Sequence, residues 1–303
     1  MTLHTMGVDF GSMTAKAVIV DGEGHICASS VVDKGVMNDE GADLAMAEVL
    51  AQTGLTIGDI AATVSTGYGR RKLEVAQRTI TEITCHARGA HALFPQARMV
   101  IDIGGQDSKI IAVDDLGHVQ QFAMNDRCAA GTGQFMQVLA RALDVELEDM
   151  GSLSLTGAED LTISAMCTTF AETEVISLRA QGHSNADILH AVMDSITKRT
   201  MGLIQRVGKR APVAMTGGVA RNIGVVRALE KRLGTPLLIS DQPQIAGALG
   251  AALFALDDAR RGIAADARPA PFDGEADRMV EPGGKGGCGR ALLPELQKIG
   301  KAP

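Results

Sequence analysis

The chain contains no tryptophan, one tyrosine and seven phenylalanines among its 303 residues. It also lacks a basic segment, because 29 Lys and Arg side chains are outnumbered by 36 Asp and Glu and the net charge is −7. Nucleic-acid binding depends on clustered positive charge and, for single strands, on aromatic side chains that stack on bases. The sequence therefore predicts no nucleic-acid partner, and a bound anion would need local donors.

Signals for secretion and for membrane insertion are missing as well. The amino terminus, Met1 to Val8, has no charged segment followed by an apolar one, and no run of about 18 apolar residues could cross a bilayer. We therefore expect a cytoplasmic protein with no membrane partner.

Cysteine is scarce and irregularly spaced. The five cysteines are an odd number without a Cys-x-x-Cys pair, which argues against a disulfide framework and against a self-contained zinc site. They are Cys27, Cys85, Cys128, Cys167 and Cys288. A metal site on this chain would have to borrow ligands from elsewhere.

The plan of the first part of the chain is repeated further on. Apolar segments at Met6–Phe10 and Ala15–Val20, joined by a polar turn, predict one β-hairpin. Arg98–Ile103 and Lys109–Val113 predict a second. The length exceeds that of a typical single domain, so this repeat indicates two duplicated halves.

The two hairpins share a polar pattern. Asp9 is followed by a glycine turn and, seven positions later, by Lys16. Asp102 is followed by Gly104 and, again seven positions later, by Lys109. We therefore predict domains at 1–96 and 97–259 and a Gly/Pro-rich tail at 260–303, with the last helix, about 245–259, free to pack back on the first domain.

Further elements follow from apolar periodicity and from turn residues. The predicted helices are 42–52, 134–143, 186–207, 225–233 and 245–259, and the further predicted strands are 61–65, 213–215 and 237–240.

Three glycine turns that follow strands could form a phosphate clamp, because backbone amides without side-chain bulk can point at an anion. They are Gly11–Thr14, Gly104–Asp107 and Thr216–Gly218. The carboxylates of Asp9 and Asp102 could hold the waters of a Mg²⁺ ion. One such turn alone is usually only a turn, whereas three across two halves are far more specific.

Two common nucleotide folds are excluded, since the chain has no GxxxxGK[ST] and no GxGxxG opening its first helix. The duplicated Asp-x-Gly hairpins and the late Gly-Gly turn instead resemble the actin-like ATPase superfamily of sugar kinases, Hsp70 and actin. This resemblance implies an α/β fold of two duplicated domains with ATP in the cleft. The implied nucleotide-binding residues are Asp9, Gly11, Ser12, Met13, Thr14, Lys16, Gly104, Gly105, Gln106, Gly217 and Gly218.

Cys128 lies in Met124–Gly133, before the helix predicted at 134–143. Cys167 lies in Ile163–Glu172, before a further predicted helix that contains Val175 and Ile176. The dipole at a helix N-terminus favours a thiolate and a negatively charged cluster. Position alone also fits a pair of buried structural cysteines.

These two segments, with three others, resemble the activators of 2-hydroxyacyl-CoA dehydratases and the ATP-binding subunits of benzoyl-CoA reductase. The other three are Asp102–Asp107, Thr66–Arg70 and Met215–Val219. The resemblance implies a [4Fe-4S] cluster shared by two subunits, identical or homologous, with Cys128 and Cys167 as the ligands from this chain. Cys27 and Cys85 fall outside the ligand motifs, and Cys288 lies in the tail without an assigned role.

Gln106 and Asp107, with Asp102, are the candidates for orienting or deprotonating the attacking water, although simple turn chemistry also explains them. Lys16 and Lys109 fit either phosphate neutralisation or solvated strand ends. Glu172 and Glu174 fit helix caps better than catalysis, and the histidines show no metal-ligand spacing.

The family resemblance implies an ATP-driven electron carrier, reduced by ferredoxin or flavodoxin, that serves a CoA-thioester dehydratase or reductase. The extra tail and the many Ala and Arg residues favour a permanent reductase subunit over a separate dehydratase activator. A small-molecule kinase of the same superfamily is the alternative, and it would be colourless where an iron–sulfur protein is brown.

Overall fold

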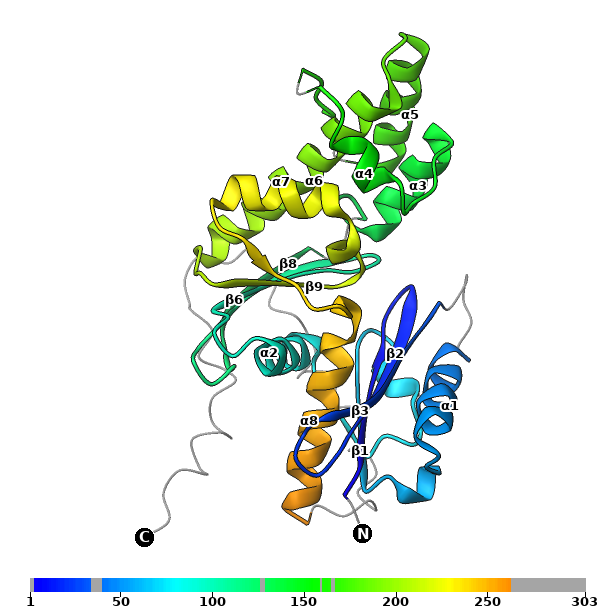
Figure 1. The fold of residues 1–303 in the computed structure, drawn as a ribbon, viewed down its shortest axis with the longest axis vertical. Helices are drawn as coiled ribbons and strands as arrows, with labels where there is room; N and C mark the ends of the chain where they lie inside the picture. The colour runs from blue at the N-terminus through cyan, green and yellow to red at the C-terminus, as the bar shows by residue number, and fades with distance from the viewer. Residues whose placement is uncertain (1–2, 34–39, 126–128, 159, 165–166, 263–303) are drawn as a thin grey trace. The chain divides into compact units, whose positions relative to one another are not determined.

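A computed structural model of the chain describes residues 3–33, 40–125, 129–158, 160–164 and 167–262. The chain divides into two units, Met1–Pro269 and Ala270–Pro303, and all described residues belong to the first. This first unit contains two five-stranded mixed sheets with helices on their faces (Figure 1).

The first sheet has the strand order β3-β2-β1-β4-β5. Its strands are β1 (Thr5–Phe10), β2 (Thr14–Val20), β3 (Ile26–Asp33), β4 (Ala62–Thr66) and β5 (Arg78–Thr79). β1 and β2 form an antiparallel hairpin in which Asp9 pairs with Lys16, and β4 runs parallel to β1. The register therefore places this aspartate and this lysine on the same face of the sheet.

The second sheet repeats this topology. Its strands are β6 (Met99–Ile103), β7 (Ser108–Val113), β8 (Val119–Asn125), β9 (Val213–Thr216) and β10 (Leu237–Leu238), in the order β10-β9-β6-β7-β8. The β6–β7 hairpin is antiparallel and pairs Asp102 with Lys109, while β9 runs parallel to β6. Each strand thus has a counterpart with the same pairing sense in the first sheet, which agrees with the predicted duplication.

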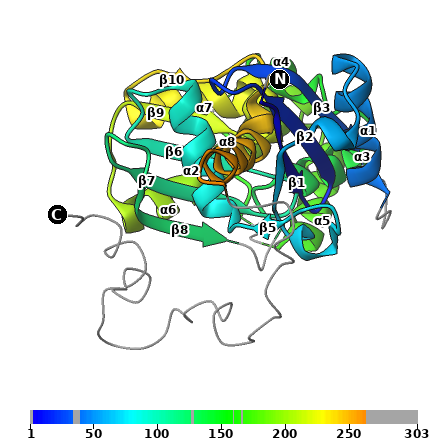
Figure 2. The ribbon, with the colours of Figure 1, turned by 90° about the horizontal axis from the view of Figure 1, so that it is seen from below.

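Two helices lie between the sheets, α2 (Glu82–Leu93) and α8 (Ala246–Arg260) (Figures 1 and 2). α8 covers the face of the first sheet opposite to α1 (Gly41–Thr53), and α2 packs both on α8 and on the second sheet. Glycine allows this close approach: a Cβ on Gly89 would lie 1.9 Å from the carbonyl oxygen of Ala246, and one on Gly250 would lie 1.9 Å from that of Cys85. The expected boundary near residue 97 assigns α2 to the first half, whereas its apolar side packs on the second sheet.

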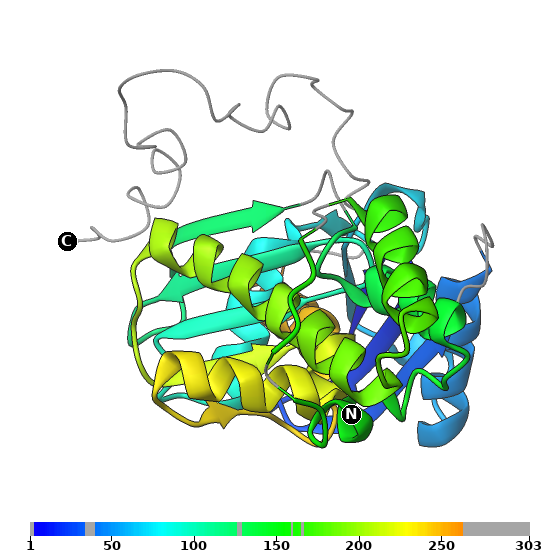
Figure 3. The same cartoon turned by 90° about the horizontal axis from the view of Figure 1, so that it is seen from above.

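The outer face of the second sheet carries a larger helical layer, in which α6 and α7 run across the strands (Figure 3). Its helices are α3 (Gly133–Leu143), α4 (Met150–Ser154), α5 (Thr168–Ala180), α6 (Asn185–Val207) and α7 (Ile223–Leu233). Their shared core contains fully buried Phe135, Leu139 and Ile188. Each such side chain contributes about 1.5–3 kcal/mol by leaving water.

Helix capping sets the starts of several helices. The side chains of Thr81, Ser184 and Asn222 accept hydrogen bonds from backbone amides of α2, α6 and α7. The described residues also form short 3₁₀ turns, which are η1 (Ile57–Asp59), η2 (Arg70–Lys72), η3 (Gly218–Arg221) and η4 (Pro243–Ile245). No helix in the described ranges has both the length and the apolar character needed to cross a membrane.

Candidate functional site

The first hairpin presents a buried ion pair beside its turn. Asp9 is 4% exposed, and its Oδ2 lies 3.3 Å from Nζ of Lys16 on the neighbouring strand. The loop after β4 packs against this carboxylate: Gly67 has φ +88°, and a Cβ there would lie 2.4 Å from Oδ1 of Asp9. Only glycine combines this backbone conformation with so close an approach.

The second hairpin holds its aspartate in a denser network. Oδ2 of Asp102 lies 3.2 Å from Nζ of Lys109, and Oδ1 accepts a hydrogen bond of 2.9 Å from Oγ1 of Thr216. Nζ of Lys109 is also 2.8 Å from Oδ1 of Asp107 and 3.7 Å from Oε2 of Glu82. One ammonium group is thus shared by three carboxyl groups, and it is too buried to be a solvated strand end.

The electrostatics of this network keep its aspartate and its lysine charged. Burial by itself raises the pKa of Asp102, but the charges of His86 and Lys109 and the hydroxyl of Thr216 outweigh it and lower the pKa to about 2. For Lys109, burial alone would lower the pKa. The carboxylates around it, Asp102 first, outweigh burial and raise the pKa above its usual value. The pKa of Glu82 is raised, because burial outweighs the attraction of Lys109.

The tips of the two hairpins meet. A Cβ on Gly105 would lie 2.3 Å from Cγ of Met13 and 3.4 Å from Oγ of Ser12. These residues belong to the turns of different sheets, so the structure brings together two of the three predicted phosphate turns.

The third turn, between β9 and η3, adjoins the second hairpin. Gly217 has φ +85°, and a Cβ there would lie 2.3 Å from the carbonyl oxygen of Ile103 and 3.0 Å from Oδ1 of Asp102. Its amide donates to the carbonyl oxygen of Pro243 at 2.9 Å. Gly218 opens η3, and a Cβ there would have Nε2 of Gln244 as its nearest neighbour, at 3.6 Å.

The remaining predicted site residues lie in the same two turns. Gly11 and Thr14 flank the tip of the first hairpin, and a Cβ on Gly11 would lie 3.0 Å from Nζ of Lys16. In the second turn the amide of Gly104 donates to the carbonyl oxygen of Asp107 at 2.9 Å, and Gln106 is exposed at the tip.

The second hairpin is also bonded to α3. The amides of Gly133 and Gln134, at the start of this helix, donate to the carbonyl oxygens of Gly104 and Gly105 at 2.9 and 2.8 Å. Two amides that a helix start leaves without intrahelical partners are thereby satisfied. Movement of the hairpin turn would be transmitted directly to α3.

The two candidate cluster cysteines flank helices that pack together, α3 and α5. Cys128 lies outside the described residues, five positions before α3 begins. Cys167 is the exposed N-cap residue of α5, and the backbone amides of Thr169 and then Phe170 lower the pKa of its thiol. For Cys167 the alternative of a buried structural cysteine is therefore wrong, and an exposed thiol with a lowered pKa is suited to bind metal as a thiolate.

Glu174 orders the segment before Cys167. Its carboxylate accepts from the amide of Ser164 at 3.0 Å and from the Oγ of Ser164 at 2.9 Å. In the other described cysteines the pKa of the thiol is raised: Cys27 is exposed and partial burial of its thiol raises the pKa, whereas Cys85 is buried and its pKa rises to about 12, mainly through desolvation. Such a thiol stays protonated and is a poor ligand.

In the described part of the chain, no three His, Cys, Asp or Glu side chains are grouped as a set that could bind a metal ion by itself. Asp9 and Asp102 nevertheless fit Mg²⁺, because this ion usually takes one or two carboxylates and completes its shell with water and substrate phosphates. A [4Fe-4S] cluster fits only if a second subunit contributes half of its thiolates, because it needs four ligands.

His86 is a residue that the sequence did not reveal. It lies on α2 and is 6% exposed, with Nδ1 3.3 Å from Oδ1 of Asp102. Neither the spacing of the histidines nor their neighbours along the chain signals this position, because the contact is made across two elements.

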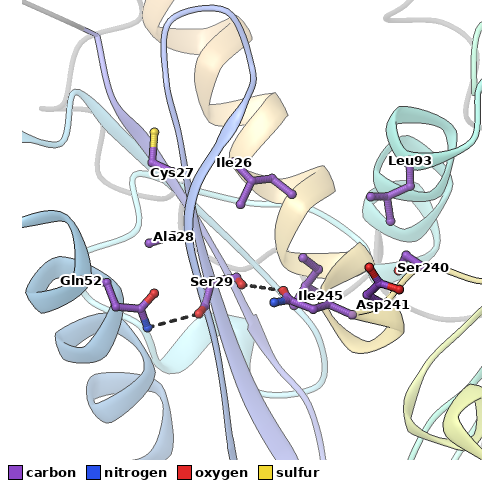
Figure 4. Close-up of a pocket in the computed structure, with 10 residues that line it drawn as sticks. Ile26, Cys27, Ala28, Ser29, Gln52, Leu93, Ser240, Asp241 and Ile245 are labelled. Atoms are coloured by element: carbon purple, nitrogen blue, oxygen red, sulfur yellow. Dashed lines mark hydrogen bonds between the residues drawn. The ribbon is translucent and has the colours of Figure 1, made fainter.

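A separate crevice of about 480 Å³ opens between β3 and the segment before α8 (Figure 4). It includes Ser29, whose Oγ donates to Oε1 of Gln242 at 2.6 Å, together with Cys27 and Leu93. None of the predicted nucleotide-site residues lines it.

The sequence profile of the BadF/BadG/BcrA/BcrD ATPase family matches residues 6–255. The activator of lactoyl-CoA dehydratase from Anaerotignum propionicum is 45% identical over 259 residues, which cover 86% of this chain and 100% of that protein. A subunit of benzoyl-CoA reductase from Thauera aromatica is 32% identical over 260 residues, which cover 82% of this chain and 92% of that protein.

Solved structures agree with these matches. Component A of (R)-2-hydroxyglutaryl-CoA dehydratase from Acidaminococcus fermentans superposes with a TM-score of 0.82 at 42% identity, covering 85% of this chain and 99% of that one. A ROK family glucokinase from Streptomyces griseus shares the fold alone, with a TM-score of 0.51 at 15% identity and coverage of 84% and 99%. The predicted α/β fold of the actin-like ATPases is thereby confirmed.

Proposed function

The chain belongs to the BadF/BadG/BcrA/BcrD ATPase family, and from this premise we propose that it uses ATP hydrolysis to drive low-potential electrons into a partner enzyme that acts on CoA thioesters. One observation carries the proposal: two equivalent Asp–Lys hairpins from two sheets meet tip to tip at Met13 and Gly105. A nucleotide held by both tips would couple its own state to the relative position of the two sheets.

The residues of the two turns would divide the work on ATP. The glycines leave room for backbone amides to approach the phosphates, and Asp9 and Asp102 would hold the waters around Mg²⁺. Mg²⁺ would supply charge neutralisation on the phosphate oxygens. Exposed Gln106 would orient the attacking water, while Asp107 is engaged by Lys109 at 2.8 Å. Gly217 and Gly218 would leave space for the adenosine.

The hydrogen bonds to α3 supply the path from this site towards the cysteines. The carbonyl groups of Gly104 and Gly105 hold the first amides of α3, so a shift of the phosphate turn must either move the helix or break two bonds. α3 packs on α5, whose N-cap is Cys167. The nucleotide state would therefore be felt at both ligand segments.

Cys128 and Cys167 would bind one half of a [4Fe-4S] cluster, and the same residues of a second subunit would bind the other half. The cluster would supply a one-electron reductant, loaded by ferredoxin or flavodoxin. The exposure of Cys167 and its lowered pKa support a thiolate ligand at this position. Phe170, exposed on the first turn of α5 and three residues after Cys167, adds an apolar side chain that fits a subunit contact.

The identities favour the role of a dehydratase activator. The chain is 45% identical to a protein named as the activator of lactoyl-CoA dehydratase and 32% identical to a subunit of benzoyl-CoA reductase. We therefore propose a separate activator of a 2-hydroxyacyl-CoA dehydratase, against the tail-based expectation of a permanent reductase subunit. The glucokinase likeness shows the fold alone and does not support a kinase.

One anaerobic preparation tests this proposal. The protein is purified without oxygen, analysed for iron and for subunit stoichiometry, and assayed for ATP-dependent reduction of a 2-hydroxyacyl-CoA dehydratase. We expect a brown dimer with four irons per two chains and electron transfer that requires hydrolysable ATP. A colourless protein that phosphorylates a small molecule would overturn the proposal in favour of the kinase.

A further inference from the structure

The two site aspartates, which come from different sheets, face one side chain that belongs to neither hairpin. That side chain is His86 on α2, and we propose that it is a positioning residue that holds Asp9 and Asp102 in the relative arrangement that Mg²⁺–nucleotide requires. The inference rests on the proposed placement of Mg²⁺ between these carboxylates.

The side of His86 towards the second hairpin is defined by a direct contact. Nδ1 lies 3.3 Å from Oδ1 of Asp102, the oxygen that also accepts from Thr216. Both side chains are almost completely buried, at 7% and 2% exposure. The distance is within ion-pair range, but the contact does not have the geometry of a hydrogen bond, so Nδ1 has no hydrogen-bond partner among the described residues. A small rotation of the ring or of the carboxylate would complete the bond.

The opposite side of the ring faces the first hairpin. A Cβ built on Gly247 of α8 would lie 3.0 Å from Nε2 of His86 and also 3.0 Å from Oδ2 of Asp9. Nε2 of His86 and Oδ2 of Asp9 are therefore within about 6 Å of each other, across a position on α8 that carries no side chain. The imidazole thus lies near both carboxylates, with Nδ1 in contact range of Asp102 and Nε2 within about 6 Å of Asp9.

The helix beneath His86 is fixed on both sides, which a positioning residue requires. Gly89 lies against the backbone of Ala246 in α8, and Ile83 packs on the second sheet. Glu82, one helical turn before His86, reaches Nζ of Lys109 at 3.7 Å. Positions i and i+4 share a helix face, so the first two turns of α2 present both side chains to the same network.

The Nδ1 atom of His86, which lacks a hydrogen-bond partner, makes one orientation of the Asp102 carboxylate more favourable than others. A buried donor without a partner is unfavourable, because the loss of its bond to water is not compensated within the protein. Any movement of Asp102 that completes the bond recovers part of this cost. His86 therefore favours one carboxylate orientation over others without touching the nucleotide.

The test measures ADP affinity with and without Mg²⁺ by calorimetry. The variants are H86L, which removes both ring nitrogens, and H86Q, which keeps a donor. The matched control is H91Q, because His91 lies on the same helix, also has a buried Nδ1 without a partner, and packs against Gly117 away from both aspartates. H86A, which also lacks both ring nitrogens, replaces H86L if the latter fails to fold by circular dichroism.

We expect H86L to weaken ADP binding in Mg²⁺ by about 10- to 100-fold, the usual loss when a residue that orients a metal ligand is removed. Binding in EDTA should stay within about twofold of wild type. H86Q should recover part of the Mg²⁺-dependent loss, and H91Q should match wild type in both buffers. An equal loss of affinity in Mg²⁺ and in EDTA would show a merely structural role and overturn the inference.

The wild-type measurement separates this inference from the function it rests on. If wild-type protein binds ADP no better in Mg²⁺ than in EDTA, the proposed Mg²⁺ site is wrong and the positioning role is lost with it. If wild type shows the Mg²⁺ effect and H86L retains all of it, the site stands and only the role of His86 is refuted.

Discussion

The two hairpins have the same sequence pattern, the same register and the same topology, yet they differ in what surrounds their aspartates. Among the residues that the structure describes, Asp9 has one cationic partner, Lys16, at 3.3 Å. Asp102 has Lys109, the hydroxyl of Thr216 and the imidazole of His86 within 3.3 Å. Duplication accounts for the shared frame, and the partners added from α2 and β9 account for the difference.

This difference indicates that the two halves have separate roles. The first hairpin is braced by backbone packing, since Gly67 approaches Asp9 and the amide of Gly69 donates to the carbonyl oxygen of Phe10 at 2.9 Å. The second hairpin is stabilised by ion pairs around Lys109, and the carbonyl oxygens of Gly104 and Gly105 accept hydrogen bonds from the start of α3. We infer that the second hairpin carries hydrolysis and its transmission, and that the first mainly closes the site.

The largest expected effect comes from replacing the aspartates. D102N should lower kcat for Mg²⁺-dependent ATP hydrolysis by about 10²- to 10³-fold, the range for losing one preorganised electrostatic contact to a transition state. D9N should lower it clearly less, because the first hairpin lies farther from the proposed hydrolytic residues. Steady-state ATPase assays on variants with native circular dichroism check this, and equal losses would remove the distinction between the halves.

Replacing the lysines tests the same comparison through the free energy of unfolding. K109M leaves Asp102, Asp107 and Glu82 without their shared cation and should cost about 3–5 kcal/mol, as expected when one partner of a buried ion pair is removed. K16M removes the cation from one carboxylate only, that of Asp9, and should lower the free energy of unfolding by about 2 kcal/mol. Urea unfolding with an unchanged m-value gives both numbers, and a K16M cost as large as that of K109M would contradict the asymmetry.

The hairpins could be predicted from sequence because their signal is local. An apolar strand, an Asp-x-Gly turn and a lysine in register all lie within a few positions of one another, and the structure places Asp9 and Asp102 as the pattern indicates. Strands β3 and β8 were not predicted, because both are edge strands with few buried positions, and their apolar residues do not alternate strictly with polar ones. α2 was also missed, since its buried face consists largely of Ala, Gly, Cys and His and gives little apolar periodicity.

The partners of the second hairpin could not be predicted from sequence, for a physical reason. Thr216, His86 and Glu82 come from elements other than the hairpin that contains Asp102. Only the packing of α2 between α8 and the second sheet brings His86 to Asp102 and Glu82 to Lys109. No spacing rule links residues on different elements. Cys128 and Cys167 were chosen through a family resemblance, and their role as ligands stays a prediction.

A smaller effect is expected at the third turn, where two adjacent glycines differ sharply in the space available for a Cβ atom. G217A forces a methyl group to within 2.3 Å of the carbonyl oxygen of Ile103 at φ +85°, which should cost about 1–3 kcal/mol. G218A is the matched control, because its methyl group would meet nothing closer than Nε2 of Gln244 at 3.6 Å. Calorimetric melting of both variants without nucleotide checks this, and similar melting temperatures would show that the turn relaxes easily.

The smallest effect tests whether the two hairpins touch in solution. In G105A the new Cβ would lie 2.3 Å from Cγ and 2.8 Å from Cβ of Met13. The Met13 side chain is flexible and can move, so the cost should be about 1 kcal/mol, at the low end for overpacking. M13A removes the Cγ contact and leaves the Cβ contact, so the double variant should recover only part of this cost.

A double-mutant cycle isolates this contact from the rest of the fold. Sites that share no contact are additive to within about 0.3–0.5 kcal/mol, so a coupling energy above that range between G105A and M13A reports that the tips of different sheets meet. Strict additivity would show that the tips stay apart without nucleotide. Repeating the cycle with Mg²⁺-ADP extends the argument: a nucleotide that both turns hold must bring the tips together, so the coupling energy should grow, and it should grow less in a D102N background than in a D9N background if the second hairpin carries the transmission.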